Sequence, residues 1–200
     1  MLSNFPLTSP KTFTSLLENN GFERKLEESV MVFKGKQLED KLNPDIKVKE
    51  ISEREIDVYS ELFLTNFEMP IEWKKGLDKL ALNWIQQGWK CYLAYVREKP
   101  VGTCLLSSLS RTGGIFNVGT LKEYRRRGIG TTLTVRALID SIDEGNGLHT
   151  LETVKEGNAE RLYKKIGFEI AHSISYFVKE SMAKIETVCA LQRSIVFCLT

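Results

Sequence analysis

The sequence has little that would direct it to a metal or a membrane. It contains four cysteines and two histidines, and no two cysteines have the C-x-x-C spacing typical of zinc ligands, so we expect no metal site. No apolar run approaches the roughly 20 residues that span a bilayer, and the N-terminal residues lack the apolar core of a signal peptide. These absences predict a cytoplasmic protein with reduced thiols and no membrane partner.

An excess of charge of one sign is also missing. The 28 lysines and arginines against 26 aspartates and glutamates leave a formal net charge of +2. Such a small excess is too little to build the electrostatic field of a general nucleic-acid binder, so we expect no nucleic-acid partner. The composition is otherwise that of a globular protein, with 42% hydrophobic and 27% charged residues in a 200-residue chain. It predicts one sizeable hydrophobic core.

From about Ile46 onward, the apolar residues switch between helical and strand-like periods, which predicts a mixed α/β fold. Helices are expected at residues 53–67, 71–87, 130–144 and 158–166, and strands at 89–97, 101–107, 115–121 and 148–154. A strand pair is expected within residues 168–179. Turns at residues 98–100 and 111–114 are expected to join the first three of these strands.

The expected domain covers residues 46–180, with an N-terminal extension at 1–45 and a C-terminal tail at 181–200. The sequence leaves open whether the tail is a strand, a docked helix or an irregular segment. Residues 13–32 align with residues 159–178 at six identical positions. This repeat has two interpretations: a degenerate partial copy of the domain, or a common local pattern in which a glycine ends a helix and an apolar residue enters a strand.

The segment LKEYRRRGIGT, residues 121–131, follows a predicted strand and opens a predicted helix. Amide N–H groups at a helix N-terminus have no acceptor within the helix, and the helix dipole there favours negative charge. Glycines let the backbone approach a phosphate, and arginines add charge-assisted hydrogen bonds. Residues 125–131, here called the arginine–glycine loop, therefore indicate an anion site, with a solvent-exposed basic turn as the alternative. The spacing differs from the dinucleotide-binding G-x-G-x-x-G motif.

A second motif, NAERLY, follows at residues 158–163 and continues into Gly167 and Phe168. Together with the arginine–glycine loop and the order of elements, it resembles the GNAT superfamily of N-acetyltransferases over about residues 46–179. The resemblance implies an α/β fold of the α+β type, with a central mixed, mostly antiparallel sheet flanked by helices. It also implies acetyl-CoA as the co-substrate.

By this resemblance, seven residues cradle the pyrophosphate of acetyl-CoA: Arg125, Arg126, Arg127, Gly128, Ile129, Gly130 and Thr131. A backbone amide of Val118, Gly119 or Thr120 would bind the thioester carbonyl and stabilise its oxyanion. Thr120 stands where the family usually has valine and Lys122 where it usually has proline, so the register of this amide is open by one residue. Asn158 would bind the cofactor or an ordered water, or simply cap its helix.

The same resemblance makes Tyr163 the acid that protonates the departing thiolate, with an aromatic packing role as the alternative. An amine with a pKa of about 10.4 arrives protonated, so a base must accept a proton before attack. Glu152 and Glu68 are the candidates for this base, and His172 is a weaker one. Each carboxylate has the alternative of an ordinary solvated surface group.

The predicted function is an acetyl-CoA-dependent N-acetyltransferase in which a small-molecule or peptide amine attacks directly in a ternary complex. The alternatives are a non-catalytic acyl-CoA-binding module and a nucleic-acid-binding protein that uses residues 125–127. Acidic side chains on the first two helices favour a cationic amine, or are simply solvated: Glu55, Asp57, Glu61, Glu68 and Glu72. The sequence indicates neither the acceptor nor the oligomeric state.

Overall fold

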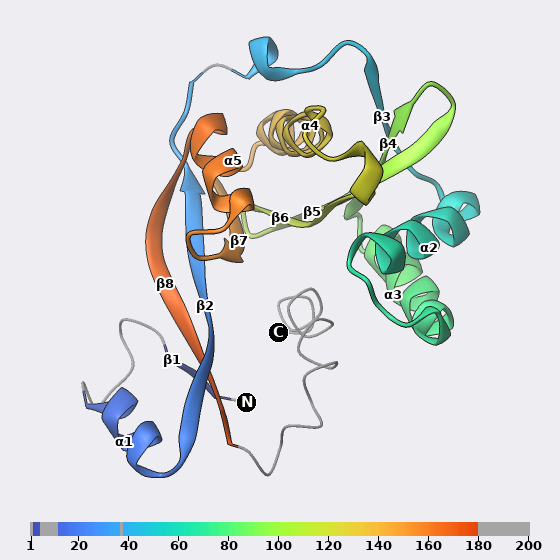
Figure 1. Ribbon diagram of the computed structural model, residues 1–200. Helices are drawn as coiled ribbons and strands as arrows, with labels where there is room; N and C mark the ends of the chain where they lie inside the picture. The colour runs from blue at the N-terminus through green and yellow to red at the C-terminus, as the bar shows by residue number, and fades with distance from the viewer. Residues whose placement is uncertain (1, 5–11, 37, 180–200) are drawn as a thin grey trace. The chain divides into compact units, whose positions relative to one another are not determined.

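The computed structural model of the chain describes residues 2–4, 12–36 and 38–179 (Figure 1). The chain divides into two compact units. The central unit comprises Gly35–Thr150, and the terminal unit combines Met1–Lys34 with Leu151–Thr200. The tail expected at residues 181–200 lies outside the described residues. Among the described residues, no helix combines the length and the apolar character needed to cross a membrane.

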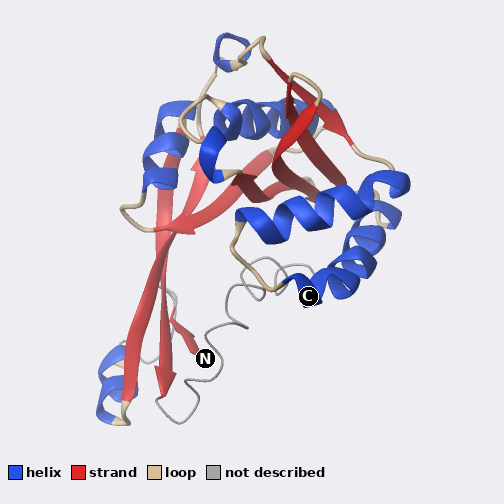
Figure 2. Cartoon of the chain, turned by 45° about the vertical axis from the view of Figure 1, so that its right-hand side comes forward, coloured by secondary structure: helices blue, strands red, loops and turns tan. Residues whose placement is uncertain are grey.

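In the central unit, four antiparallel strands are ordered β6-β5-β4-β3. The strands are β3 (Ile46–Glu50), β4 (Lys90–Val96), β5 (Lys99–Leu109) and β6 (Thr112–Thr120). The helices are α2 (Ile56–Asn66), α3 (Lys74–Gln86) and α4 (Ile129–Asp143), with short 3-10 turns at Glu39–Lys41, Glu53–Glu55, Ile71–Trp73 and Lys122–Tyr124. Figure 2 shows these helices around the sheet.

Helices α2 and α4 cover opposite faces of this sheet. A Cβ added to Gly102 would meet Ile129 and Leu133 of α4, whereas Thr103, the next residue of β5, bonds to Asn66 of α2. Because successive residues of a strand point to opposite faces, the two helices lie on different sides. The sheet therefore has a hydrophobic core on each of its two faces. The core includes these large buried side chains: Tyr59, Phe63, Trp84, Tyr92, Leu93, Leu105 and Leu133.

Local sequence signals explain where the helices begin and end. Ser52 and Glu55 form a reciprocal capping box before α2, with the Ser52 amide donating to Glu55 Oε2 at 3.1 Å. Gly88, with φ of 81°, follows the end of α3, and Gly167, with φ of 120°, caps α5. The four expected helices are confirmed.

Two turns of the central unit differ in position from the sequence-based expectation. The β5–β6 turn is formed by Ser110 and Arg111, which both have positive φ (50° and 62°), so Gly113 and Gly114 belong to β6. A Cβ on Gly113 would lie 1.9 Å from Ser141 Oγ of α4, so this glycine permits close helix–strand contact rather than a turn. Residues 99 and 100, likewise expected in a turn, begin β5.

The terminal unit contains strands in the order β1-β8-β2-β7. Its elements are β1 (Leu2–Asn4), α1 (Phe13–Asn19), β2 (Phe22–Phe33), β7 (Leu148–Val154, whose first residues belong to the central unit), α5 (Asn158–Ile166) and β8 (Phe168–Lys179). The strand pair expected within residues 168–179 is wrong: β8 is one strand, because β2 pairs with it antiparallel along its whole length (Figure 1). The expected mixed, mostly antiparallel sheet flanked by helices is otherwise confirmed.

The segment with the predicted repeat folds as a helix, a glycine and a strand. Gly21, with φ of 76°, separates α1 from β2, as Gly167 separates α5 from β8. Leu17 of α1 and Tyr163 of α5 hold equivalent positions in the repeat, and both are buried. The two copies meet through the β2–β8 pairing, which joins their strands in opposite directions. The origin of residues 1–45 as a partial domain copy stays a prediction.

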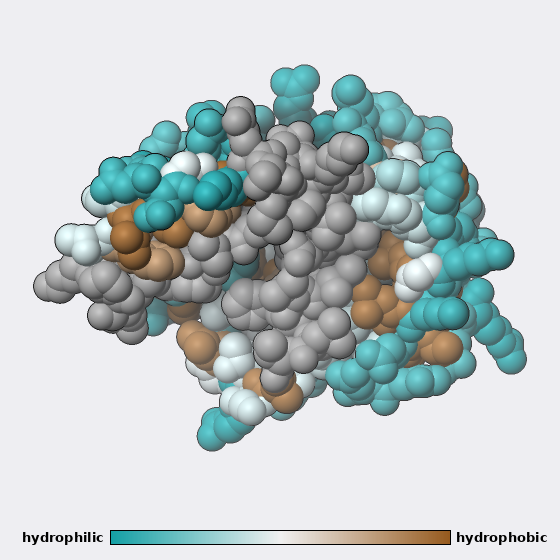
Figure 3. Space-filling model, turned by 90° about the horizontal axis from the view of Figure 1, so that it is seen from below, coloured by the Kyte–Doolittle hydropathy of each residue, from teal (hydrophilic) through white to brown (hydrophobic). Residues whose placement is uncertain are grey.

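Several large apolar side chains reach the surface, among them Leu109 and Ile71. Figure 3 shows hydrophobic groups between hydrophilic ones on the face that it displays. Isolated exposed apolar side chains are ordinary in folded proteins, so they assign no function by themselves.

Candidate functional site

The arginine–glycine loop connects β6 to α4 in the central unit. Its backbone turns twice through positive φ, at Arg126 (63°) and at Gly128 (86°), and Gly128 is the N-cap of α4. No side chain caps this helix. Its first-turn amides therefore have neither an acceptor within the helix nor a capping side chain, and residues 125–127 beside them are exposed. Such a run of amides with adjacent guanidinium groups suits a phosphate.

Hydrogen bonds from another segment fix the loop. Asn43 donates from Nδ2 to the carbonyl of Arg127 and from its backbone N–H to Thr132 Oγ1, both at 3.3 Å. Thr132 in turn donates its hydroxyl to the carbonyl of Gly128 at 3.0 Å. These hydrogen bonds fix the backbone conformation of the loop before an anion binds. The loop therefore loses less conformational entropy on binding.

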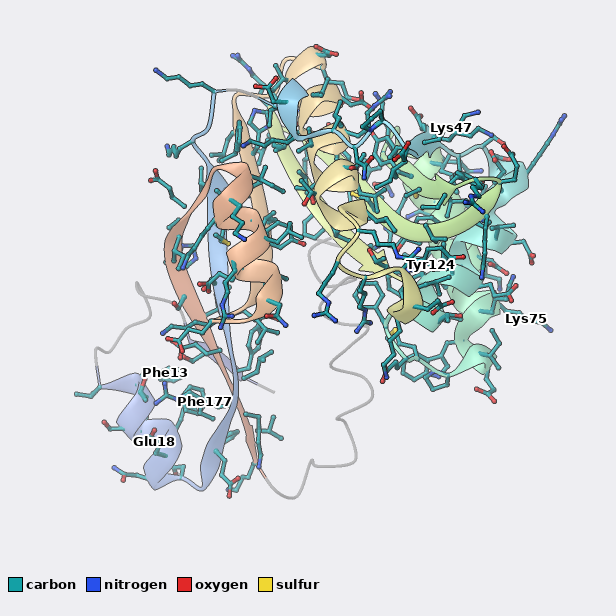
Figure 4. The ribbon with its side chains drawn as sticks, turned by 45° about the horizontal axis from the view of Figure 1, so that its top comes forward. Phe13, Glu18, Lys47, Lys75, Tyr124 and Phe177 are labelled. Carbon is teal, nitrogen blue, oxygen red and sulfur yellow. The ribbon has the colours of Figure 1, made fainter. Side chains whose placement is uncertain are left out.

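Tyr124, labelled in Figure 4, has two cationic side chains near its ring. The guanidinium carbon of Arg127 and the ammonium of Lys99 each lie 5.1 Å from the centre of its ring. Arg125 donates from Nε to the carbonyl of Thr120 at 3.2 Å. Because a guanidinium has five N–H donors, these contacts orient Arg125 and Arg127 and leave donors for an anion.

The predicted thioester-binding residues Val118, Gly119 and Thr120 end strand β6, directly before this loop. Gly119 is buried and the other two are half-buried. Thr103 pairs with Gly119 and Leu105 with Phe116, so two residues, Asn117 and Val118, lie opposite the single residue between Thr103 and Leu105. This is a β-bulge, with φ of 56° at Asn117, and a bulge leaves one residue out of the ladder. No pattern in the sequence predicts this bulge.

The other two predicted motif residues lie in the terminal unit. Asn158 is exposed and is the first residue of α5, whereas Gly157 is the N-cap, so the capping role considered for Asn158 is wrong. Tyr163 is 6% exposed, and its ring packs edge-on against Phe168 with the centroids 6.0 Å apart. The packing role considered for Tyr163 is therefore present, and it does not remove the hydroxyl's capacity to donate a proton.

Glu152 on β7 is half-buried, and its burial together with the neighbouring carboxyl of Glu28 raises the pKa of Glu152 to about 7. Glu28 on β2 is itself buried. A carboxyl with this pKa changes its protonation at neutral pH, which is the property required of a general base. His172, the weaker candidate, is half-buried on β8.

Glu160 fixes the start of α5. It is 2% exposed, accepts a hydrogen bond from Ser29 Oγ at 2.7 Å and another from the amide of Glu156 at 2.9 Å, and pairs with Lys164 at 2.6 Å. The Lys164 ammonium and these hydrogen bonds lower the pKa of Glu160 to about 2. No pattern in the sequence predicts this role for Glu160, because its partner Ser29 lies far away in the chain.

Glu68 follows α2 and is exposed, with φ of 53°. Some of the other acidic side chains on the first helices have local partners: Asp57 pairs with Lys74, and Glu55 bonds to Ser52 and Lys49. These local contacts explain the presence of Asp57 and Glu55, so neither residue is evidence for the binding of a cationic acceptor. Because Glu68 is exposed whereas Glu152 is half-buried with a raised pKa, Glu152 is the better supported base.

Comparison with known proteins agrees with the resemblance in the sequence. Residues 87–170 match the family model of the acetyltransferase (GNAT) domain, and this segment contains the arginine–glycine loop, β7 and α5. No curated protein matches the chain.

Solved structures of low sequence identity share the fold. A GCN5-related N-acetyltransferase from Sphaerobacter thermophilus superimposes with a TM-score of 0.72 at 20% identity, over 88% of this chain and 58% of that one. A functionally unknown conserved protein from Staphylococcus epidermidis gives 0.66 at 17% identity, over 90% and 72% of the two chains. A predicted acetyltransferase with acetyl-CoA from Clostridium acetobutylicum gives 0.51 at 18% identity, over 62% and 90%.

Proposed function

Because the chain contains a GNAT acetyltransferase domain, we propose that it transfers an acetyl group from acetyl-CoA to an amine by direct attack. The observation that carries this proposal is the N-terminus of α4, where uncapped amides, the positive φ of Gly128 and three exposed arginines meet. A pyrophosphate suits these donors in both shape and charge.

A backbone amide near the end of β6 is proposed to bind the thioester carbonyl. A bulge places Asn117 and Val118 opposite a single residue of β5, so one backbone amide falls outside the regular β5–β6 pairing and would be able to donate to the thioester carbonyl. This amide stabilises the charge that develops on the carbonyl oxygen during attack. The bulge favours Val118 over Gly119 and Thr120 for this role.

Two further residues are proposed for proton transfer, Glu152 as the base and Tyr163 as the acid. Glu152, with its pKa raised to about 7, accepts a proton from the incoming ammonium. The amine nitrogen then bonds to the carbonyl carbon as the C–S bond breaks, and the second proton that the nitrogen loses replaces the one that the acid gives to the sulfur. Tyr163 donates a proton to the departing sulfur, as the motif resemblance implies, with Phe168 holding its ring. Asn158 contributes a polar group at the start of the same helix.

Two measurements test this function together. Acetyl-CoA at 100 times its dissociation constant stabilises a protein by about 2.7 kcal/mol, and for a chain of this size the melting temperature then rises on the order of 5–10 °C. Thiol release with a panel of primary amines, peptides and amino sugars reports turnover. The variant Gly130→Asp places a carboxylate against the phosphates and should abolish the thermal shift.

A thermal shift without turnover on any amine would instead support a non-catalytic acyl-CoA-binding module. The absence of a shift at saturating acetyl-CoA, with calorimetry also blank, would exclude both functions.

A further inference from the structure

Asn43, a residue outside the arginine–glycine loop, bonds to the start of α4 at two points. It lies between the 3-10 turn Glu39–Lys41 and strand β3, within the residues expected as an N-terminal extension. Buried side chains anchor the segment on both sides of it, Leu38 before it and Ile46 after it. The Ile46 amide also donates to the Asn43 carbonyl at 3.1 Å. Asn43 therefore has a fixed position beside the loop.

The contacts of Asn43 determine the orientation of its side-chain amide. Its Oδ1 atom accepts a hydrogen bond from the backbone amide of Asp45 at 3.0 Å, and its Nδ2 atom donates to the carbonyl of Arg127 at 3.3 Å. The reversed orientation would place an oxygen against the Arg127 carbonyl and a nitrogen against the Asp45 N–H group. The first contact with the loop is thus a donor held against the Arg127 carbonyl.

The second contact runs through Thr132 to the carbonyl of Gly128. The Asn43 backbone N–H group donates to Thr132 Oγ1 at 3.3 Å, and Thr132 donates its only hydroxyl proton to the Gly128 carbonyl at 3.0 Å. The amide of Thr132 donates to the same carbonyl at 2.9 Å. Thr132 is buried, so water competes little for these bonds.

Because both carbonyls are held, the directions of two amide N–H groups are also set. A trans peptide unit is planar, and its C=O and N–H groups point in opposite directions. The Arg127 carbonyl shares one such unit with the N–H group of Gly128, and the Gly128 carbonyl shares the next with the N–H group of Ile129. Both N–H groups therefore point away from Asn43 and Thr132, at the uncapped N-terminus of α4.

The backbone of the loop needs such support. Arg126 has φ of 63°, which is uncommon for a residue other than glycine, and Gly128 has φ of 86°. A glycine can adopt many other conformations at little cost, so its two peptide units would rotate without external contacts. A ligand would then have to order them on binding, which weakens its affinity.

We propose that Asn43 is a positioning residue for the cofactor, because it sets the N–H groups of Gly128 and Ile129 for the pyrophosphate of acetyl-CoA. This inference rests on the proposed binding of acetyl-CoA at the loop. Asn43 acts through the carbonyls of Arg127 and Gly128, so its effect is confined to the part of the ligand that the loop binds. The N-terminal segment thereby contributes to the affinity for the cofactor.

Two variants of Asn43 test the role of its Nδ2 donor. Asn43→Ala removes both polar atoms of the side chain, whereas Asn43→Ser keeps an oxygen that can accept from the Asp45 amide, as serine does in comparable turns. We expect calorimetry without an acceptor to show that each variant binds acetyl-CoA about 5-fold more weakly than the wild type, the scale of one hydrogen bond. Wild-type affinity in Asn43→Ser would show that the donor to Arg127 is not what matters, and would overturn the inference.

A shortened substrate separates positioning from a general structural effect. S-acetyl-pantetheine carries the same thioester as acetyl-CoA and lacks the pyrophosphate. We expect the variants to use it with the kcat/KM of the wild type, whereas their KM for acetyl-CoA rises about 5-fold with kcat unchanged. A damaged fold would lower kcat/KM for both substrates.

Asn146→Ala is the matched control, because Asn146 bonds beyond the other end of α4. Its Nδ2 atom donates to Ser108 Oγ at 2.9 Å and to Ser141 Oγ at 3.1 Å. Thermal unfolding should show a loss of stability in this variant, and calorimetry should show the wild-type affinity for acetyl-CoA. A 5-fold weaker affinity here as well would mean that any lost contact of α4 has this effect, and would contradict a specific role of Asn43.

The possible failures are distinguishable. If the wild type does not bind acetyl-CoA, the proposed function and the inference are both wrong. If it binds acetyl-CoA and both Asn43 variants bind it equally well, the function stands and Asn43 does not position the loop. If the variants lose kcat/KM for S-acetyl-pantetheine as much as for acetyl-CoA, Asn43 supports only the fold, and the inference is wrong.

Discussion

A carboxyl group serves as a proton acceptor near neutral pH only when its surroundings disfavour its charged form. Glu152 has such surroundings, because it is half-buried beside the carboxyl of Glu28. Of the carboxylates that the sequence suggested, it is therefore the better supported base. The sequence identified Glu152 by its place on a strand between two motifs. It did not reveal Glu28 as a neighbour, because β2 lies far from β7 in the chain.

We expect kcat/KM to rise with pH through about 7, since Glu152 accepts a proton only when it is ionised. Glu152→Gln should lower turnover roughly 10²-fold and remove this rise, because an amide cannot take the proton. Glu28→Gln should move the midpoint to lower pH, because it removes the neighbouring charge that opposes ionisation of Glu152. A pH profile of Glu152→Gln that kept its wild-type midpoint would assign the base to another group.

Tyr163→Phe tests the acid separately from its packing. The phenyl ring keeps the edge-on contact with Phe168, so we expect the melting temperature and the affinity for acetyl-CoA to stay nearly unchanged. Turnover should fall about 10²-fold, the usual scale for the loss of a general acid. Wild-type turnover in this variant, with chemistry shown to be rate-limiting, would reduce Tyr163 to a packing residue.

At the scale of single elements, local signals predicted the helices well and the strand connections less well. Capping residues and terminal glycines are encoded nearby, so α2, α3, α4 and α5 appear close to where they were expected. The errors arise from contacts across the chain. Gly113 was expected in a turn but lies in β6, where Ser141 of α4 approaches it closely. The bulge at Asn117 depends on the pairing register between β6 and β5.

Gly128 gives a prediction at this scale. Gly128→Ala places a Cβ on a residue with φ of 86°, which should cost about 1 kcal/mol of stability and weaken acetyl-CoA binding by disturbing the loop at the N-terminus of α4. Gly88→Ala is the matched control, because Gly88 has φ of 81° at the other end of a helix and open space around it. Thermal unfolding and calorimetry should show similar stability losses, with reduced acetyl-CoA affinity only for Gly128→Ala. Equal affinities would contradict the role of the loop.

At the scale of the whole molecule, one of the two compact units combines segments that are distant in the sequence, and the expected domain bounds of 46–180 stay a prediction. Residues 1–34 group with residues 151–200, because β2 pairs with β8 from end to end. Composition and local periodicity carry no information on such a distant pairing. The repeat of residues 13–32 in residues 159–178 indicated a relation between the two segments, and the structure adds that their strands pair. An ion pair between Lys155 and Glu27 and a hydrogen bond from Ser29 to Glu160 also join distant parts of the chain within this unit.

The last prediction concerns the acid stability that Glu160 gives to this unit. Because its pKa is lowered to about 2, the ionised carboxylate contributes stability above about pH 4.5, and the contribution is lost as the pH falls towards 2. Glu160→Gln keeps the shape but removes the charge that Ser29 and Lys164 bind, so it should cost about 2–3 kcal/mol at pH 7. Urea unfolding at several pH values should show the difference from wild type shrinking below pH 4. Glu169→Gln, at an exposed position on β8, is the control and should change stability little at any pH. A difference between Glu160→Gln and wild type that stayed constant down to pH 2 would show that the carboxylate's charge is not what stabilises the start of α5.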